Sequence, residues 1–248
     1  MHKGLLVFLL SSFCQLAWGG TISSPKLSEV ISRSYLLSAS ALVYFNPQER
    51  APNPRSLTAV FYNLNTIYTY MGAQEQPAAL AQPLAAIKSI LDRLEALPPS
   101  QRESYPELVL QLLSEQQKLS QGAEELYVEQ HDPSDSVGLA FNRQSNDLAK
   151  LLLDYQLRHY PEMSSSALVL SPAELQALVD TIEQRFSRLI NEHAEHAEAL
   201  SKINAQYRFV RGQVLQRKEH LHTGVEFYLS RAVLDLYDLA GSLAVSPH

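Results

Sequence analysis

The stretch SPAELQALVDTIEQRFSRLINEHAEHAEAL, residues 171–200, decides the fold class of this chain. It opens with Ser171 as an N-cap, Pro172 at the first helical position and Glu174 three residues after the cap. This combination is a capping box, which marks the start of a helix. An apolar residue then recurs at helical spacing almost to the end of the chain. The stripe consists of Leu175, Val179, Ile182, Phe186, Leu189, Leu200, Ile203, Tyr207, Val214, Leu221, Val225, Leu229, Leu236 and Leu243.

One uninterrupted helix along this stripe would be roughly 110 Å long at 1.5 Å per residue, too long for a domain of this size. We therefore expect one break, near Gly212 or at Thr223-Gly224, and two long helices.

The N-terminal half has the same character. Ser24-Pro25 and Asn53-Pro54 are further helix starts, and three more amphipathic segments cover about 78–97, 106–130 and 136–160. No segment shows the alternation typical of a strand. The sequence predicts an all-α fold, an antiparallel bundle of six or seven amphipathic helices with the last two long. A division into two smaller helical subdomains near 160–171 is the alternative layout.

The first residues read MHKGLLVFLLSSFCQLAWGG. Lys3 provides a positive start, residues 5–10 an apolar core, and residues 17–19 a small-x-small cleavage site. We interpret 1–19 as a signal peptide and 20–248 as a single helical domain. The only cysteine, Cys14, leaves with the signal, and no Asn-x-Ser/Thr sequon occurs. These features favour a periplasmic or secreted protein of a bacterial envelope.

Charge and motifs narrow the function classes. The formal net charge is −6, or −7 (19 basic against 26 acidic residues) once Lys3 is removed. Such a surface disfavours nucleic acid as a partner. No later segment is apolar enough for a membrane span. No nucleophile elbow, P-loop, dinucleotide fingerprint or haem box occurs, so we expect neither enzymatic activity nor a cofactor.

Two histidines stand out on the C-terminal stripe. On an uninterrupted helix, His193 lies in the middle of the buried face and His196 at its margin. A buried imidazole needs a hydrogen-bond partner, which a tyrosine or carbonyl across the bundle would supply. The pair could instead bind a transition metal, because residues at i and i+3 share a helix face. A proton-responsive or ligand-contacting role is the third interpretation.

A cationic group follows on the same stripe and includes Arg208, Arg211 and His222. On an uninterrupted helix these side chains point inward, where they could hold an anionic ligand or pair with carboxylates. A bend at Gly212 would instead turn them outward. Both outcomes stay open at this point.

Together these features predict an exported, non-catalytic module of the periplasm with a protein partner in the cell envelope. It would serve as a protein-interaction, envelope-accessory or sensing protein. The alternative is a helical bundle that binds a small ligand or a transition metal through His193 and His196.

Overall fold

The computed structural model describes residues 22–49, 51–72, 77–130, 136–163, 166–216 and 223–245. Within these ranges every regular element is a helix, which confirms the predicted all-α class. The predicted signal peptide, 1–19, lies outside the described residues. The helices in chain order are α1 (Ser24–Tyr44), α2 (Pro54–Met71), α3 (Ala78–Ala96), the 3₁₀ helix η1 (Pro99–Ser104), α4 (Tyr105–Gln130), α5 (Ser136–His159), α6 (Pro172–Glu192), the 3₁₀ helix η2 (Ala194–His196), α7 (Ala197–Leu215) and α8 (Thr223–Val245).

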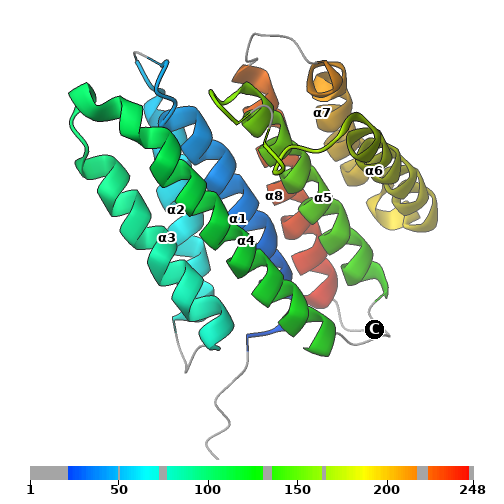
Figure 1. Cartoon of the computed structure of the whole chain (residues 1–248). Coiled ribbons are helices and arrows are strands. Elements are labelled where there is room, and N and C mark those ends of the chain that lie inside the picture. Colours follow the sequence, from blue (N-terminus) through cyan, green and yellow to red (C-terminus); the bar gives the residue numbers. More distant parts are fainter. Residues whose placement is uncertain are drawn as a thin grey trace, which may run out of the picture.

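Helix α1 lies at the centre of the molecule. It packs against α2, α4, α5 and α8, so nearly all of its surface is covered. Figure 1 shows α2 and α3 beyond it on one side, and α6 and α7 on the far side of α5. Helix α3 packs on α4, α6 packs on both α5 and α7, and α7 also packs on α8. Among the helices of the described ranges, none has the length and hydropathy that a bilayer crossing requires.

The covered position of α1 explains its composition. Leucine and valine residues such as Leu27, Val30 and Leu37 are fully buried, and so are the small residues Ser32 and Ser38. Small side chains let neighbouring helices approach closely, because little volume separates the backbones. A helix covered on all sides needs such residues in place of a single apolar stripe.

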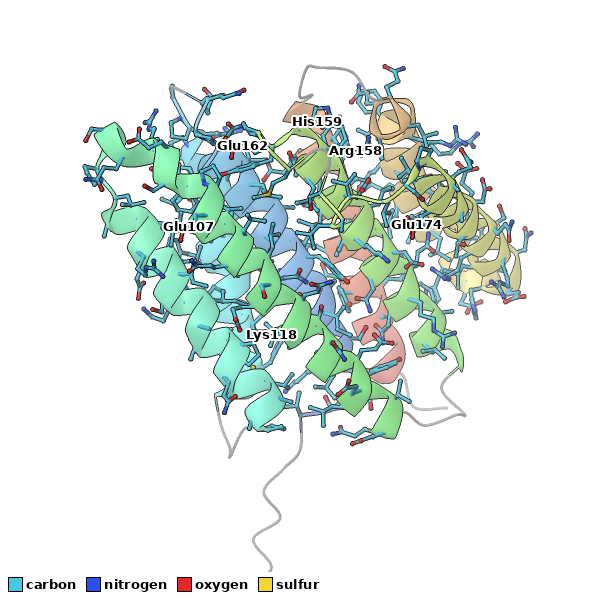
Figure 2. All side chains as sticks on the ribbon, in the orientation of Figure 1. Glu107, Lys118, Arg158, His159, Glu162 and Glu174 are labelled. Carbon is cyan, nitrogen blue, oxygen red and sulfur yellow. The ribbon has the colours of Figure 1, made fainter. Side chains whose placement is uncertain are left out.

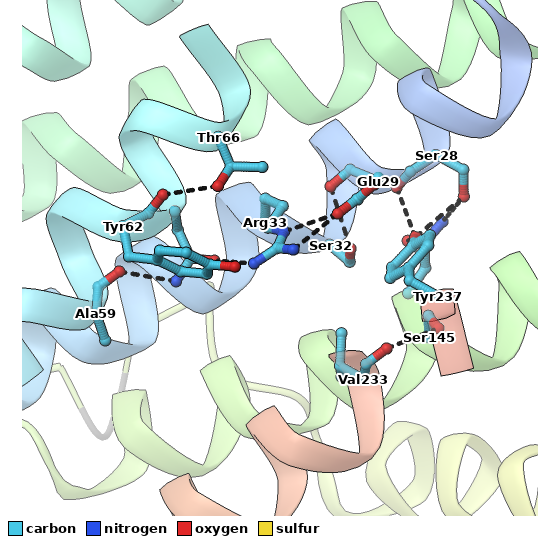
Figure 3. Close-up of polar contacts among 12 residues, drawn as sticks. Ser28, Glu29, Ser32, Arg33, Ala59, Tyr62, Thr66, Ser145, Val233 and Tyr237 are labelled. Atoms are coloured by element: carbon cyan, nitrogen blue, oxygen red, sulfur yellow. Dashed lines mark hydrogen bonds and ion pairs between the residues drawn. The ribbon is translucent and has the colours of Figure 1, made fainter. Parts of the chain in front are cut away.

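A buried arginine joins α1 to α2. The guanidinium of Arg33 donates from Nε and Nη2 to Oε1 of Glu29, at 3.0 and 2.8 Å, and from Nη1 to Oδ1 of Asn63 at 3.1 Å. Its Cζ lies 5.2 Å from the centroid of the Tyr62 ring. Figure 3 shows Arg33 between Glu29 and Tyr62. The arginine side chain is only 8% exposed, so this cluster is part of the core.

The two ends of the described chain meet at a second polar contact on α1. The hydroxyl of Tyr237, on α8, donates to the carbonyl oxygen of Ser28 at 2.9 Å and lies 3.2 Å from Oδ1 of Asn146 on α5. Figure 3 shows Tyr237 turned toward Ser28. This contact holds the first and last helices side by side.

Local capping signals in the sequence are present in the structure. Asn53 accepts a hydrogen bond from the backbone N–H of Arg55 at 3.0 Å, at the start of α2. At the start of α6, Ser171 Oγ accepts from the N–H of Glu174 at 3.3 Å, and the Glu174 carboxylate accepts from the N–H of Ser171 at 2.8 Å. The predicted capping box is confirmed. Figure 2 shows Glu174 on the outer face of the molecule. Glu107 and Lys118 on α4 are exposed in the same way.

The expected break is present, because α7 ends at Leu215 and α8 begins at Thr223, although Gly212 itself lies inside α7. An additional turn, not expected from the sequence, lies at His193, which has φ −120° and ψ 69°, and η2 leads directly into α7. The turn folds α7 back onto α6, so that Phe186 and Tyr207 pack with ring centroids 5.9 Å apart. This packing buries the apolar stripe, which one long helix would leave largely exposed.

The extra turn raises the helix count. The described residues contain eight α-helices, where the sequence predicts six or seven. The long helix expected from residue 172 is divided into α6 and α7, with 21 and 19 residues, and the longest helix is α4, with 26.

The connector between α5 and α6 contacts the core at several points. Tyr160 and Met163 are buried, and the Tyr160 hydroxyl donates to the carbonyl oxygen of Phe45 at 2.9 Å. The N–H of Leu170 donates to Oδ1 of Asp154 at 2.8 Å. Helices that precede this connector in the chain also pack on helices that follow it, as α1 and α5 do on α8.

Candidate binding site on helices α6, α7 and α8

A polar cavity of about 400 Å³ opens between α6 and α7. We call it the arginine cavity, and it is lined by Glu183, Ser187, Asn204, Arg208 and Arg211. The α6 residues are spaced i, i+4, and the α7 residues are spaced i, i+4, i+7. Each set therefore lies on one face of its helix. Because the turn at His193 folds α7 back on α6, the two polar faces meet.

Among the described residues, Glu183 is the only acidic one that lines the cavity. Its Oε1 accepts a hydrogen bond from Nε of Arg211 and another from the Tyr207 hydroxyl, at 3.3 Å. The hydrogen bond to Glu183 raises the pKa of Arg211 above its ordinary value. Burial raises the pKa of Tyr207, and the charge of Glu183 raises it further. Arg211 therefore stays protonated, and the Tyr207 hydroxyl stays neutral, at neutral pH.

Arg208 differs from Arg211. Its side chain is exposed, and no ion pair joins its guanidinium to a carboxylate of the described residues. Two guanidinium groups thus line a cavity that contains one carboxylate. The cavity has a local excess of positive charge, although the chain as a whole is acidic.

An aromatic patch lies on α7 and α8. It consists of Phe209, Phe227 and Tyr228. Each phenylalanine is 65% exposed. The rings of Phe209 and Phe227 lie 4.8 and 5.2 Å from the ring of Tyr228, centroid to centroid. Arg208 directly precedes Phe209 in the chain but lies about 100° away from it around α7, on the face that lines the cavity.

The two histidines lie at the α6–α7 turn. Their side chains are 16% and 21% exposed, so neither is fully buried. His193 Nδ1 and His196 Nε2 lie 3.5 and 3.9 Å from the same carboxylate oxygen of Glu195. The pKa of Glu195 is lowered, first by a hydrogen bond from its own backbone N–H and then by the charges of the two histidines. His193 also lies against the Phe141 ring, 5.9 Å between centroids.

The positions expected for the histidines on a continuous helix are wrong, because α6 ends at Glu192 and both histidines lie in the turn that leads to α7. The described ranges contain no group of three or more histidine, cysteine, aspartate or glutamate residues placed to hold a metal ion. Neither histidine lines the arginine cavity.

The structure brings together Arg208 and Arg211, two of the three residues singled out as ligand-binding. Both are more exposed than an inner stripe implies, and the reason is the turn at His193 and not a bend at Gly212. His222 lies outside the described residues.

Sequence reasoning missed Glu183, Asn204 and the aromatic patch. A signal for Phe209 was present, because it lies about 120° from the apolar stripe of α7 at 100° per residue. Comparisons with known protein families, with curated proteins and with solved structures found no match to this chain.

Proposed function

We propose that this protein is an exported, non-catalytic helical module of the bacterial periplasm, folded as an antiparallel bundle, that binds a protein partner of the cell envelope. The aromatic patch is the observation that supports the proposal. Two phenylalanine rings, each 65% exposed, gather around Tyr228 instead of turning into the core. Clustered exposed apolar groups mark interaction surfaces, whereas single exposed apolar residues are ordinary.

The chemistry of the patch defines the partner surface. Aromatic rings provide large contact areas with few rotatable bonds. The patch therefore favours an apolar surface on the partner. The role of the protein would be to assist an envelope assembly or to present a sensing surface.

Site-specific photocrosslinking tests the docking surface. A photoreactive phenylalanine analogue replaces Phe209 or Phe227 in the full chain, expressed in a bacterial host. The matched control carries it at Val128 on α4, which is 67% exposed. We expect both patch positions, and not position 128, to give the same adduct with one envelope protein.

The purified partner then provides the decisive measurement. Phe209→Ser should weaken its binding at least about tenfold, the effect of losing a hot-spot side chain. Val128→Ser should leave the affinity unchanged. Equal affinity of the partner for wild type and for Phe209→Ser would contradict the proposal, as would equal adducts from position 128.

Export is tested separately by the mass of the chain recovered from the periplasm. We expect a species that lacks residues 1–19. An uncut chain, retained in the cytoplasm, would contradict export and leave the docking test unaffected.

A further inference from the structure

The arginine cavity has a property that docking at the aromatic patch does not use. Its two guanidinium groups face one carboxylate, and Arg208 is not paired with any described residue. An arginine fork matches a carboxylate or a phosphate in a two-point hydrogen bond, and this geometry is stronger than a neutral contact. The cavity volume, about 400 Å³, also falls within the usual range of small-molecule sites.

We propose that the arginine cavity binds a small organic anion, whose carboxylate or phosphate group pairs with Arg208 and shares Arg211 with Glu183. Asn204 on α7 lines the same cavity and supplies an amide N–H donor. Glu183 holds Arg211 in place through its hydrogen bond, and Tyr207 in turn holds Glu183. Arg211 is therefore positioned before the anion arrives, which lowers the entropic cost of binding.

Glu183 also limits the affinity of the site. It places a negative charge on the same guanidinium that the ligand approaches, so the ligand and Glu183 repel each other. An anion site with this arrangement binds more tightly when the internal carboxylate is neutralised. A cavity in which Glu183 simply completes a surface ion pair has no such response.

The experiment uses the full mature chain and two probes, inorganic phosphate and succinate, at constant ionic strength. Backbone amide shifts in α6 and α7 are followed by NMR up to about 10 mM probe, a range that covers millimolar dissociation constants. We expect saturable shifts at residues that line the cavity. The probe that binds more tightly distinguishes a phosphate ligand from a carboxylate ligand.

Three variants separate the cavity from general charge effects. Arg208→Ala should weaken binding about tenfold, the loss of one charge-assisted pair. Glu183→Gln should tighten it by roughly threefold or more, because it removes the repelling charge. Arg188→Ala removes an exposed arginine of α6 that does not line the cavity, and it should change the affinity less than about twofold.

The variants also separate this site from the docking surface. Phe209→Ser should leave anion binding unchanged, whatever its effect on the partner. Circular dichroism establishes that each variant is folded. The proposal is overturned if neither probe shifts the cavity residues, if Arg208→Ala binds as tightly as wild type, or if Glu183→Gln binds more weakly.

Discussion

Arginine occurs in two contrasting settings in this molecule. On α1, Arg33 is buried, and Glu29, Asn63 and the Tyr62 ring contact its guanidinium. On α7, Arg208 and Arg211 line an open cavity and have one carboxylate between them. The same side chain thus stabilises the core in one place and has unused binding capacity in the other. What distinguishes the two settings is how many hydrogen-bonding and charged partners surround the guanidinium, since the residue type is the same.

The largest effect is expected at the enclosed arginine. Arg33→Ala should lower the free energy of unfolding by about 3 kcal/mol, because it leaves Glu29 as a charge without its partner in the core. Urea denaturation monitored by circular dichroism measures the change. The double variant Arg33→Met with Glu29→Leu should recover most of the loss. If Arg33→Ala lowered the free energy of unfolding by less than about 1 kcal/mol, the Arg33–Glu29 pair would contribute no more than an exposed ion pair does.

An intermediate effect is expected at Glu226, a carboxyl group on α8 that has no cationic partner among the described residues. It accepts hydrogen bonds from Ser40 on α1, at 2.9 Å, and Ser56 on α2, at 3.3 Å. Burial raises its pKa, and the two serine hydroxyls lower it only in part. The folded state therefore binds this proton more tightly than the unfolded state does.

The sign of the pH dependence follows from this difference. The contribution of Glu226 to stability is complete below the unfolded pKa and is lost as the pH rises through the raised, folded pKa. Glu226→Gln removes the charge, and its amide can accept from one serine hydroxyl and donate to the oxygen of the other. It should raise the free energy of unfolding by about 1 kcal/mol near pH 8. The gain should disappear in mild acid. A variant equal to wild type across this pH range would show that the carboxylate is well solvated.

The smallest effect is expected at the open cavity. Arg211→Ala should change the free energy of unfolding by no more than about 0.5 kcal/mol, since its pair with Glu183 is exposed to water and screened by salt. Urea denaturation alongside Arg33→Ala gives the direct comparison. A loss as large as that of Arg33→Ala would mean that the cavity pair is a structural element of the bundle.

The helix starts could be predicted from the sequence because their hydrogen bonds are local. The capping box of Ser171 and Glu174, and the cap at Asn53, need only residues within three positions of each other. The all-α class follows for the same reason, from apolar spacing along each segment.

The turn at His193 could not be predicted in this way. No glycine or proline marks it, and its cause is the packing of Phe186 on Tyr207, residues more than five helical turns apart in sequence. The same turn places α6 opposite the face of α7 that carries the two arginines. The sequence therefore indicates Arg208 and Arg211 as candidates, but not Glu183 as the residue opposite them.

The covered position of α1 has a kinetic consequence. This helix leaves the ribosome early, yet its neighbour α8 follows only after α2 to α7, and the Ser28–Tyr237 contact closes a loop of more than two hundred residues. Contacts so distant in sequence slow folding, because the intervening chain must first be ordered. Until α8 arrives, one flank of α1 has no neighbour to cover it, and incomplete chains expose a surface that favours aggregation. Nascent chains that stop before residue 223 should therefore depend on a chaperone much more than the finished protein does.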